Sequence, residues 1–111
     1  MIKDTITFPD FAKLDIRVGT IEVAERVENS ERLVRFEVDL GKEIGKRQII
    51  AGIALQYEAE NLLGKQVTVL VNLESKKMMG LESRGMLLAA GEDKIALLKP
   101  DKTIANGGIV R

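Results

Sequence analysis

The sequence predicts an all-β domain: a five-stranded barrel with one short helix between its third and fourth strands. Apolar and polar residues alternate along several short segments, which is typical of strands that turn one face to a core and the other to water. The body of the chain carries only one convincing helical signature. Five short strands of this kind must roll up to bury their apolar faces, so a small closed barrel is expected. An open sandwich of the same strands is the alternative.

The first half of the chain supplies three of the five strands. Alternation within residues 15–27 is shifted by one position at Gly19, which predicts a bulge or a sharp bend. A second strand with one wet face is expected at residues 34–40. Residues 42–45 form a turn in this interpretation, and residues 46–54 form the third strand.

The second half supplies the short helix and the remaining strands. The helical turn at 58–65 ends at Gly64, a residue type that suits the position just past a helix end. Two main strands follow at 66–71 and 84–90. Two minor elements are also expected: a helical turn within residues 8–14, with Pro9 near its start, and a short sixth strand at 95–98.

The arrangement fits an oligonucleotide/oligosaccharide-binding (OB) barrel, with the bend at Gly19 letting the first strand serve both halves. With 111 residues, the chain is long enough for one domain with its own core. We expect a single domain over residues 1–111, with the barrel at about 12–90 and the terminal extensions at a dimer interface.

Composition points to a soluble globular protein. Hydrophobic residues make up 45% and charged residues 31% of the chain. No apolar run approaches the ~20 residues that span a bilayer, so no membrane association is expected. Asp4 and Asp10 interrupt the stretch where a signal peptide would need unbroken apolar residues, which predicts a cytoplasmic protein.

The chain contains no Cys and no His, which argues against an enzyme. Disulfides, thiol nucleophiles, Cys-rich zinc sites and iron–sulfur clusters are excluded, and the commonest general base near neutral pH is missing. Ser75 and Lys76, or Ser83, resemble a Ser–Lys pair but lack a group to orient a base. Asp15 and Arg17 fit a structural ion pair better. We therefore expect no catalytic residue, no metal and no cofactor.

The net charge is zero, from 17 basic and 17 acidic residues, which argues against coating nucleic acid through bulk charge. The distribution is uneven. Residues 1–31 hold four basic and seven acidic side chains, a net charge of −3, so residues 32–111 carry +3. A local basic face is expected, and its partner would be recognised more by shape than by the overall electrostatic field of the protein.

Residues 72–90 form the most informative stretch, because an exposed Lys-Lys pair sits in a Gly-bounded polar hairpin between two apolar strands. Together with D-x-R-V-G at residues 15–19, this stretch resembles the tRNA-binding domain family, and the resemblance covers roughly residues 8–100. The pattern N-L-x-x-(R/K)-K-x-x-G-x-x-S-x-G-M is matched by Asn72, Leu73, Lys76, Lys77, Gly80, Ser83, Gly85 and Met86.

That family includes the free-standing bacterial tRNA-binding protein, the C-terminal dimerisation domain of methionyl-tRNA synthetase and the endothelial monocyte-activating polypeptide, with the chaperone CsaA as a close cousin. The resemblance implies an OB barrel, a homodimer and tRNA recognition by shape, alone or as an accessory or β subunit of methionyl-tRNA synthetase. Two alternatives stay open: a CsaA-like dimeric chaperone that binds unfolded or exported peptides, and a protein–protein module without RNA contact.

The sequence departs from the family pattern at a few positions. Glu74 and Ser75 replace a common Lys-Pro, which removes a positive charge and a rigid residue. Arg84 stands where Gln is common and returns a charge nearby. The EIG at 43–45 and the NGG near the C-terminus resemble the chaperone branch.

The predicted RNA contacts are of two kinds, charged side chains and uncharged ones. Lys76 and Lys77 would meet phosphates as point charges, while Arg84 could bridge a phosphate or stack on a base. Ser83 could donate to a phosphate or a 2′-hydroxyl. Met86 is either an apolar rest for a base or sugar, or a core residue.

Three further candidates lie outside the hairpin's tip. Asn72 either contacts RNA or caps a turn by bonding its own backbone. Arg32 and Arg35, at the start of the second strand, would face RNA because OB barrels present strands two and three to ligand. The alternative for Arg35 is a surface ion pair with Glu37 or Glu31. Arg47 belongs to this face less clearly.

Aromatic residues make up only 4% of the chain, which argues against stacking a single strand of nucleic acid. Phe36 is in register with the core, and Phe8 and Phe11 are expected to fill the end of the barrel. Docking on a folded RNA through its backbone fits better. The remaining apolar residues at both termini need cover that a second copy would supply; they are Ile2, Ile6, Phe8, Ile104, Ile109 and Val110.

Overall fold

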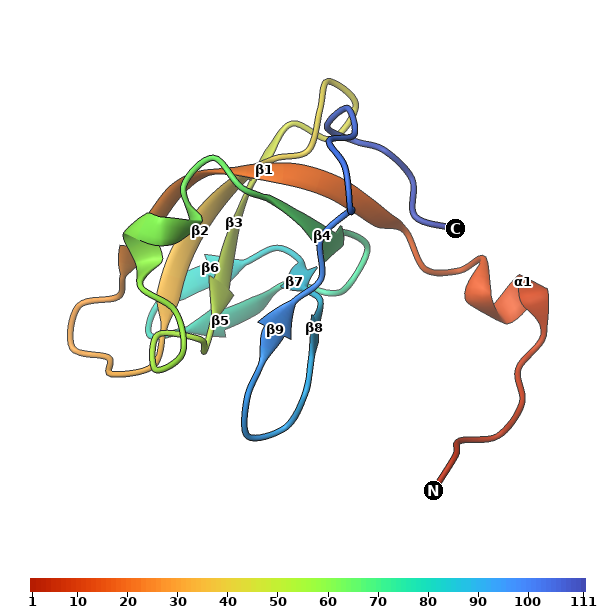
Figure 1. The fold of residues 1–111 in the computed structure, drawn as a ribbon, viewed down its shortest axis with the longest axis horizontal. Coiled ribbons are helices and arrows are strands. Elements are labelled where there is room, and N and C mark those ends of the chain that lie inside the picture. The colour runs from red at the N-terminus through yellow and green to blue at the C-terminus, as the bar shows by residue number, and fades with distance from the viewer.

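An antiparallel sheet that curls into a nearly closed barrel forms the body of the protein, as the computed structural model of residues 1–111 shows (Figure 1). Its strands lie side by side in the order β3-β2-β1-β4-β7, and the 3-10 helix η1 (Ala59–Leu62) connects β3 to β4. This arrangement confirms the all-β prediction and the OB barrel. The barrel strands are β1 (Ile16–Arg26), β2 (Val34–Asp39), β3 (Lys46–Ala51), β4 (Gln66–Leu70) and β7 (Met86–Leu87).

One short helix and four short strands lie outside this five-stranded sheet. They are α1 (Phe8–Phe11), β5 (Lys76–Met78), β6 (Leu81–Ser83), β8 (Ala89–Ala90) and β9 (Ala96–Leu97). Strands β5 and β6 pair as one hairpin, and β8 pairs with β9 as another. The strand predicted at 84–90 is therefore two short strands, and the third strand ends at Ala51, earlier than predicted. Gly64 follows η1 with a φ of 78°, which confirms its role past the helix end.

The core follows the predicted alternation. In β2, Val34, Phe36 and Val38 are fully buried between residues that are partly exposed. Ile49 from β3 and Val69 from β4 complete the same cluster. The barrel closes where the backbone N–H of Arg84 donates to the carbonyl of Gln48 across 2.9 Å, which joins the last segment to β3.

Strand β1 serves both halves of the barrel, pairing with β4 over residues 16–20 and with β2 over residues 20–26. The irregularity in its register lies between Ile21 and Val23, so the bulge predicted at Gly19 falls three residues later. Gly19 has a different role. A Cβ there would lie 2.6 Å from Cγ1 of Val38, so this position must be Gly for β1 to approach β2.

The C-terminal segment covers the open edge at the start of β1. The N–H of Val18 donates to the carbonyl of Gly108 (2.9 Å), and the N–H of Val110 donates to Ile16 (2.8 Å). The N-terminal arm carries α1 away from the barrel on the side where the C-terminus also lies (Figure 1). No helix of the structure has the length and apolarity needed to cross a membrane.

The prediction that Phe8 and Phe11 fill the end of the barrel is wrong. Thr7 and Asp10 form a capping box that starts α1, and this short helix stands on the extended arm. The two phenyl rings pack on each other with 6.3 Å between their centroids. Phe8 is 76% exposed, because no part of the barrel reaches it.

Candidate nucleic-acid interface

The hairpin of β5 and β6 carries the two adjacent lysines. Its register pairs Lys76 with Ser83, Lys77 with Glu82, and Met78 with Leu81. Because neighbouring residues of a strand point to opposite faces, Lys77 and Glu82 share the solvent face while Met78 and Leu81 share the face toward the barrel. The two lysines therefore lie within a strand, and both are exposed.

Arg47 fixes the base of this hairpin. Its Nη1 donates to the carbonyl of Val71 (2.9 Å), just before the hairpin, and to the carbonyl of Arg84 (3.3 Å), just after it. Burial lowers the pKa of Arg47 from its ordinary value, and the nearby charge of Arg84 lowers that pKa further. Sequence reasoning placed Arg47 among possible ligand contacts, but its guanidinium is occupied in holding the two ends of the hairpin together.

Gln48 and Ser83 attach the second strand of the hairpin to β3. The Gln48 side chain donates to the carbonyl of Glu82 across 2.8 Å. Ser83 Oγ accepts from the N–H of Ile50 (3.0 Å) and donates to the carbonyl of Gly85 (3.3 Å). Ser83 is only 5% exposed, and both hydrogen bonds of the hydroxyl that was predicted to donate to RNA lie within the protein.

Asn72 bonds the N-terminal arm, and so does not form the turn cap that was one of its two predicted roles. Its side-chain nitrogen donates to the carbonyl of Lys13 (2.7 Å), and its side-chain oxygen accepts from the N–H of Asp15 (2.9 Å). The carboxamide thus reaches across to the N-terminal arm and does not cap its own turn. The residue is exposed, and each polar atom of its carboxamide makes one hydrogen bond within the protein.

Arg35 is held in the ion pair given as its alternative. Its Nε donates to Glu25 (2.8 Å) and its Nη1 lies 3.4 Å from Glu37, which was one of the two predicted partners. The hydrogen bond that Arg35 donates to Glu25 raises the pKa of Arg35. A third bond reaches Oε1 of Gln48 (3.1 Å), so this guanidinium is engaged within the sheet.

Four cations around the hairpin are unengaged. The side chains of Lys76, Lys77, Arg84 and Arg32 form no ion pair and no hydrogen bond within the protein, and all four residues are exposed. Three belong to the hairpin and the residue after it, while Arg32 lies in the loop that precedes β2. The cationic side chains at the hairpin are therefore unpaired, whereas those on the barrel strands form ion pairs or hydrogen bonds.

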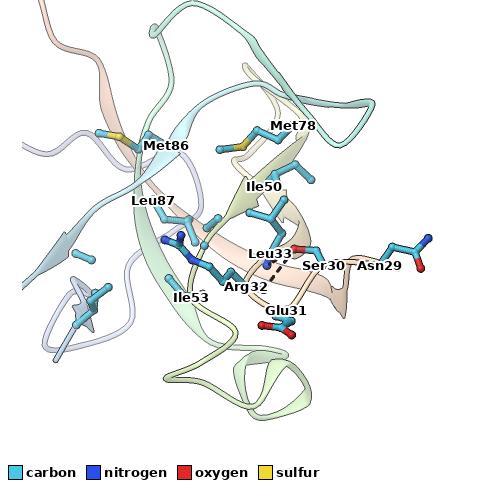
Figure 2. Close-up of a pocket in the computed structure, with 14 residues that line it drawn as sticks. Asn29, Ser30, Glu31, Arg32, Leu33, Ile50, Ile53, Met78, Met86 and Leu87 are labelled. Atoms are coloured by element: carbon cyan, nitrogen blue, oxygen red, sulfur yellow. Dashed lines mark hydrogen bonds between the residues drawn. The ribbon is translucent and has the colours of Figure 1, made fainter. Parts of the chain in front are cut away.

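A hollow of about 780 Å³ lies between Arg32 and the hairpin. Figure 2 shows Met78 and Met86 on one side, Arg32 on the other, and Ile50 and Leu87 between them. The walls are mostly apolar. Met86 is 45% exposed, so it belongs to this surface and is not enclosed in the core. Flexible thioethers beside a free guanidinium can accommodate a flat or irregular apolar group.

The features that sequence reasoning missed concern the hairpin's supports and its tip. Arg47 and Gln48 lie on β3, where three polar residues precede two buried isoleucines, so the sequence does not show which backbone groups their side chains reach. Met79 and Gly80 form the connection between β5 and β6 with φ values of 52° and 79°. The sequence predicted a Gly-bounded hairpin here but not the positive φ of Met79, because Asn-Gly or Asp-Gly is the usual sequence of such a turn.

Comparison with known proteins places this geometry in context. Residues 16–108 match the family model described as "Putative tRNA binding domain". The methionine–tRNA ligase of Methanothrix thermoacetophila is 52% identical over 110 residues, which cover 98% of this chain and 16% of that protein. The Thermotoga maritima ligase is 48% identical over 97% of this chain and 17% of its own length. The chain thus spans about one sixth of the curated relatives it matches.

Two solved structures share the whole fold. A MetRS-related protein from Pyrococcus horikoshii superimposes with a TM-score of 0.91 at 32% identity, covering 98% of this chain and all of its own. The chaperone CsaA from Bacillus anthracis superimposes with a TM-score of 0.88, also at 32% identity, covering 97% of this chain and all of its own.

Proposed function

Since the chain belongs to the tRNA-binding domain family, we propose that it binds folded tRNA through the cations of its β5–β6 hairpin. One observation carries this proposal: Lys76, Lys77 and Arg84, with Arg32 across the hollow, are exposed and unpaired. The lysines supply point charges to phosphates, and an arginine can grip a phosphate with two parallel hydrogen bonds. Contacts of this kind position the RNA without reading its sequence.

Recognition by shape follows from the rigidity of this hairpin. Arg47, Gln48 and Ser83 attach it to the barrel at its base and along one strand. Cationic side chains that extend from an anchored backbone reach phosphates best where the RNA backbone has a matching spacing and curvature. The near absence of aromatic residues supports a folded RNA as ligand, because single strands are usually bound by stacking.

The relatives favour a role beside an aminoacyl-tRNA synthetase. Several curated relatives are methionine–tRNA ligases that contain this segment as about one sixth of their length. We infer that the domain adds tRNA contacts to a synthetase, in the same chain or as an accessory subunit, and performs no catalysis of its own. Its place of action would then be the cytoplasm.

A homodimer is part of the proposal. Ile2, Ile6 and Phe8 are exposed on the N-terminal arm, and Ile109 is exposed on the C-terminal segment beside β1. Both termini lie on one side of the barrel (Figure 1). A two-fold related copy would bury these residues in a self-complementary patch and present two hairpins to one RNA.

A gel shift with bulk tRNA, run between 50 and 200 mM salt, tests the proposed function. If a dimer contacts about 4–6 phosphates, affinity should fall by roughly two to three decades over this range. A complex whose affinity does not respond to salt, or no complex at 50 mM salt, rejects binding through phosphates.

The hollow of Figure 2 supports a second candidate, a chaperone that binds unfolded peptides. CsaA shares the fold, and methionine-lined apolar surfaces adapt to varied side chains. The two functions separate in one comparison. An array of unfolded peptides that binds the protein independently of salt, while bulk tRNA does not bind, would favour the chaperone.

A further inference from the structure

The tip of the hairpin holds an unfavourable residue in an unfavourable conformation. Strands β5 and β6 are joined by two residues, Met79 and Gly80, both with positive φ. A two-residue connection of this kind favours Asn, Asp or Gly at its first position, because other side chains collide with their own backbone in the left-handed region. Met79 therefore destabilises the turn that it forms.

A comparison within the chain supports this view. Only Asn29 and Met79 among the non-glycine residues have positive φ. Asn29 is of a type that tolerates this conformation, since its short side chain can bond the local backbone. The side chain of Met79 cannot form a bond of this kind.

Packing does not offset the cost at Met79. The residue is 58% exposed and lines a hollow of about 560 Å³ whose walls are mainly polar and include Glu25, Arg26 and Asn29. A thioether that is more than half exposed, among mainly polar neighbours, gains little apolar burial to offset the strain of the turn. Strain that the fold does not need is a reason to look for a function.

We infer that Met79 is a binding residue that packs against an unstacked base in a loop of the folded RNA. This inference rests on the proposed function. Lys77 lies two residues before Met79, about 7 Å along an extended strand, so a phosphate and a base of the same RNA region can meet them together. An unbranched, polarisable side chain suits the flat face of any base.

Four variants separate the contact from the strain. Met79→Asn removes the apolar group and suits the turn, so it should raise Tm by about 3–6 °C and weaken binding to tRNA. Met79→Ala removes the same group but keeps the strain, so only binding should fall. Met79→Leu keeps an apolar group and should bind tRNA like the parent. Leu63→Ala truncates a comparably exposed apolar residue away from the hairpin and should leave binding unchanged.

Each protein is measured by thermal melting and by gel shift against two probes, bulk tRNA and a fully paired RNA duplex. The inference predicts a loss of about three- to tenfold in affinity for tRNA in Met79→Asn and Met79→Ala, the scale expected when one apolar contact is lost. Affinity for the duplex should not change, because the duplex offers no unstacked base.

Equal binding of tRNA by the parent and both variants overturns the inference, as does an equal loss on tRNA and duplex. An unchanged Tm in Met79→Asn overturns the claim of strain. A parent protein that binds neither probe overturns the proposed function, and the inference with it.

Discussion

The side-chain oxygen of Asn72 accepts a hydrogen bond from the backbone N–H of Asp15, with 2.9 Å between the two atoms. The same carboxamide donates to the carbonyl of Lys13. One side chain therefore bonds both Lys13 and Asp15 in the short segment that leads from α1 into β1. Asn72 also begins the segment that leads to the β5–β6 hairpin. The arm proposed to form the dimer and the hairpin proposed to bind RNA are therefore joined at this residue.

Replacing Asn72 by Ala should loosen the N-terminal arm while leaving the barrel folded. Two exposed hydrogen bonds are lost, which should cost about 1–2 kcal/mol of unfolding free energy. Trypsin should cleave after Lys13 faster, because the carbonyl of that bond is the one Asn72 holds. Cleavage after Lys3, which Asn72 does not touch, is the internal control. Unchanged cleavage after Lys13 would show that the arm is held by something else.

Gly19→Ala should destabilise the barrel. The added Cβ would meet Cγ1 of Val38 at 2.6 Å and the carbonyl of Asp39 at 2.9 Å, so β1 and β2 would have to separate. Overpacking of this kind costs about 1–3 kcal/mol, which urea unfolding measures through its midpoint. Gly52→Ala is the matched control, since a Cβ there meets its nearest atom, Nη2 of Arg32, at 3.8 Å. Equal midpoints for the two variants would contradict the close approach at Gly19.

The protein should sediment as a dimer at tens of micromolar, at about twice its chain mass of 12.3 kDa. Phe8→Asp and Ile109→Asp each place a charge in the proposed interface, and their side chains touch little else in the barrel, so each should yield a folded monomer. Leu55→Asp charges an equally exposed apolar residue on the loop between β3 and η1 and should leave the dimer intact. A monomeric parent would remove the dimer from the proposal.

The barrel was predictable because the sequence patterns that mark its elements lie within short, continuous segments of the chain. Alternation such as that of Val34, Phe36 and Val38 marks a strand and its buried face without knowledge of the neighbouring strands. Gly64 likewise marks the end of η1 by its own conformational freedom.

The roles of the site residues depend on partners that are distant in sequence. Asn72 bonds a residue 57 positions away, and Ser83 bonds one 33 positions away, so no local pattern separates these structural roles from RNA contacts. Arg35 and Lys76 are both cations on strands, and only the fold shows that Arg35 forms ion pairs while Lys76 lies opposite Ser83 and forms none. Which cations remain free is a property of the tertiary structure.

The most direct test of the account is tRNA binding by the double variant Lys76→Ala/Lys77→Ala, measured by gel shift over a range of salt concentrations. Both lysines are exposed and unpaired, so stability should change by less than about 0.5 kcal/mol. The variant Lys99→Ala/Lys102→Ala removes the same charge from exposed positions outside the hairpin and serves as the matched control. The account predicts that the hairpin variant alone loses at least about tenfold in affinity at low salt, with a plot of log affinity against log salt that is shallower by roughly two units for each hairpin that contacts the RNA. Binding equal to that of the parent, or an equal loss in the Lys99/Lys102 control, would contradict the placement of the RNA site on this hairpin.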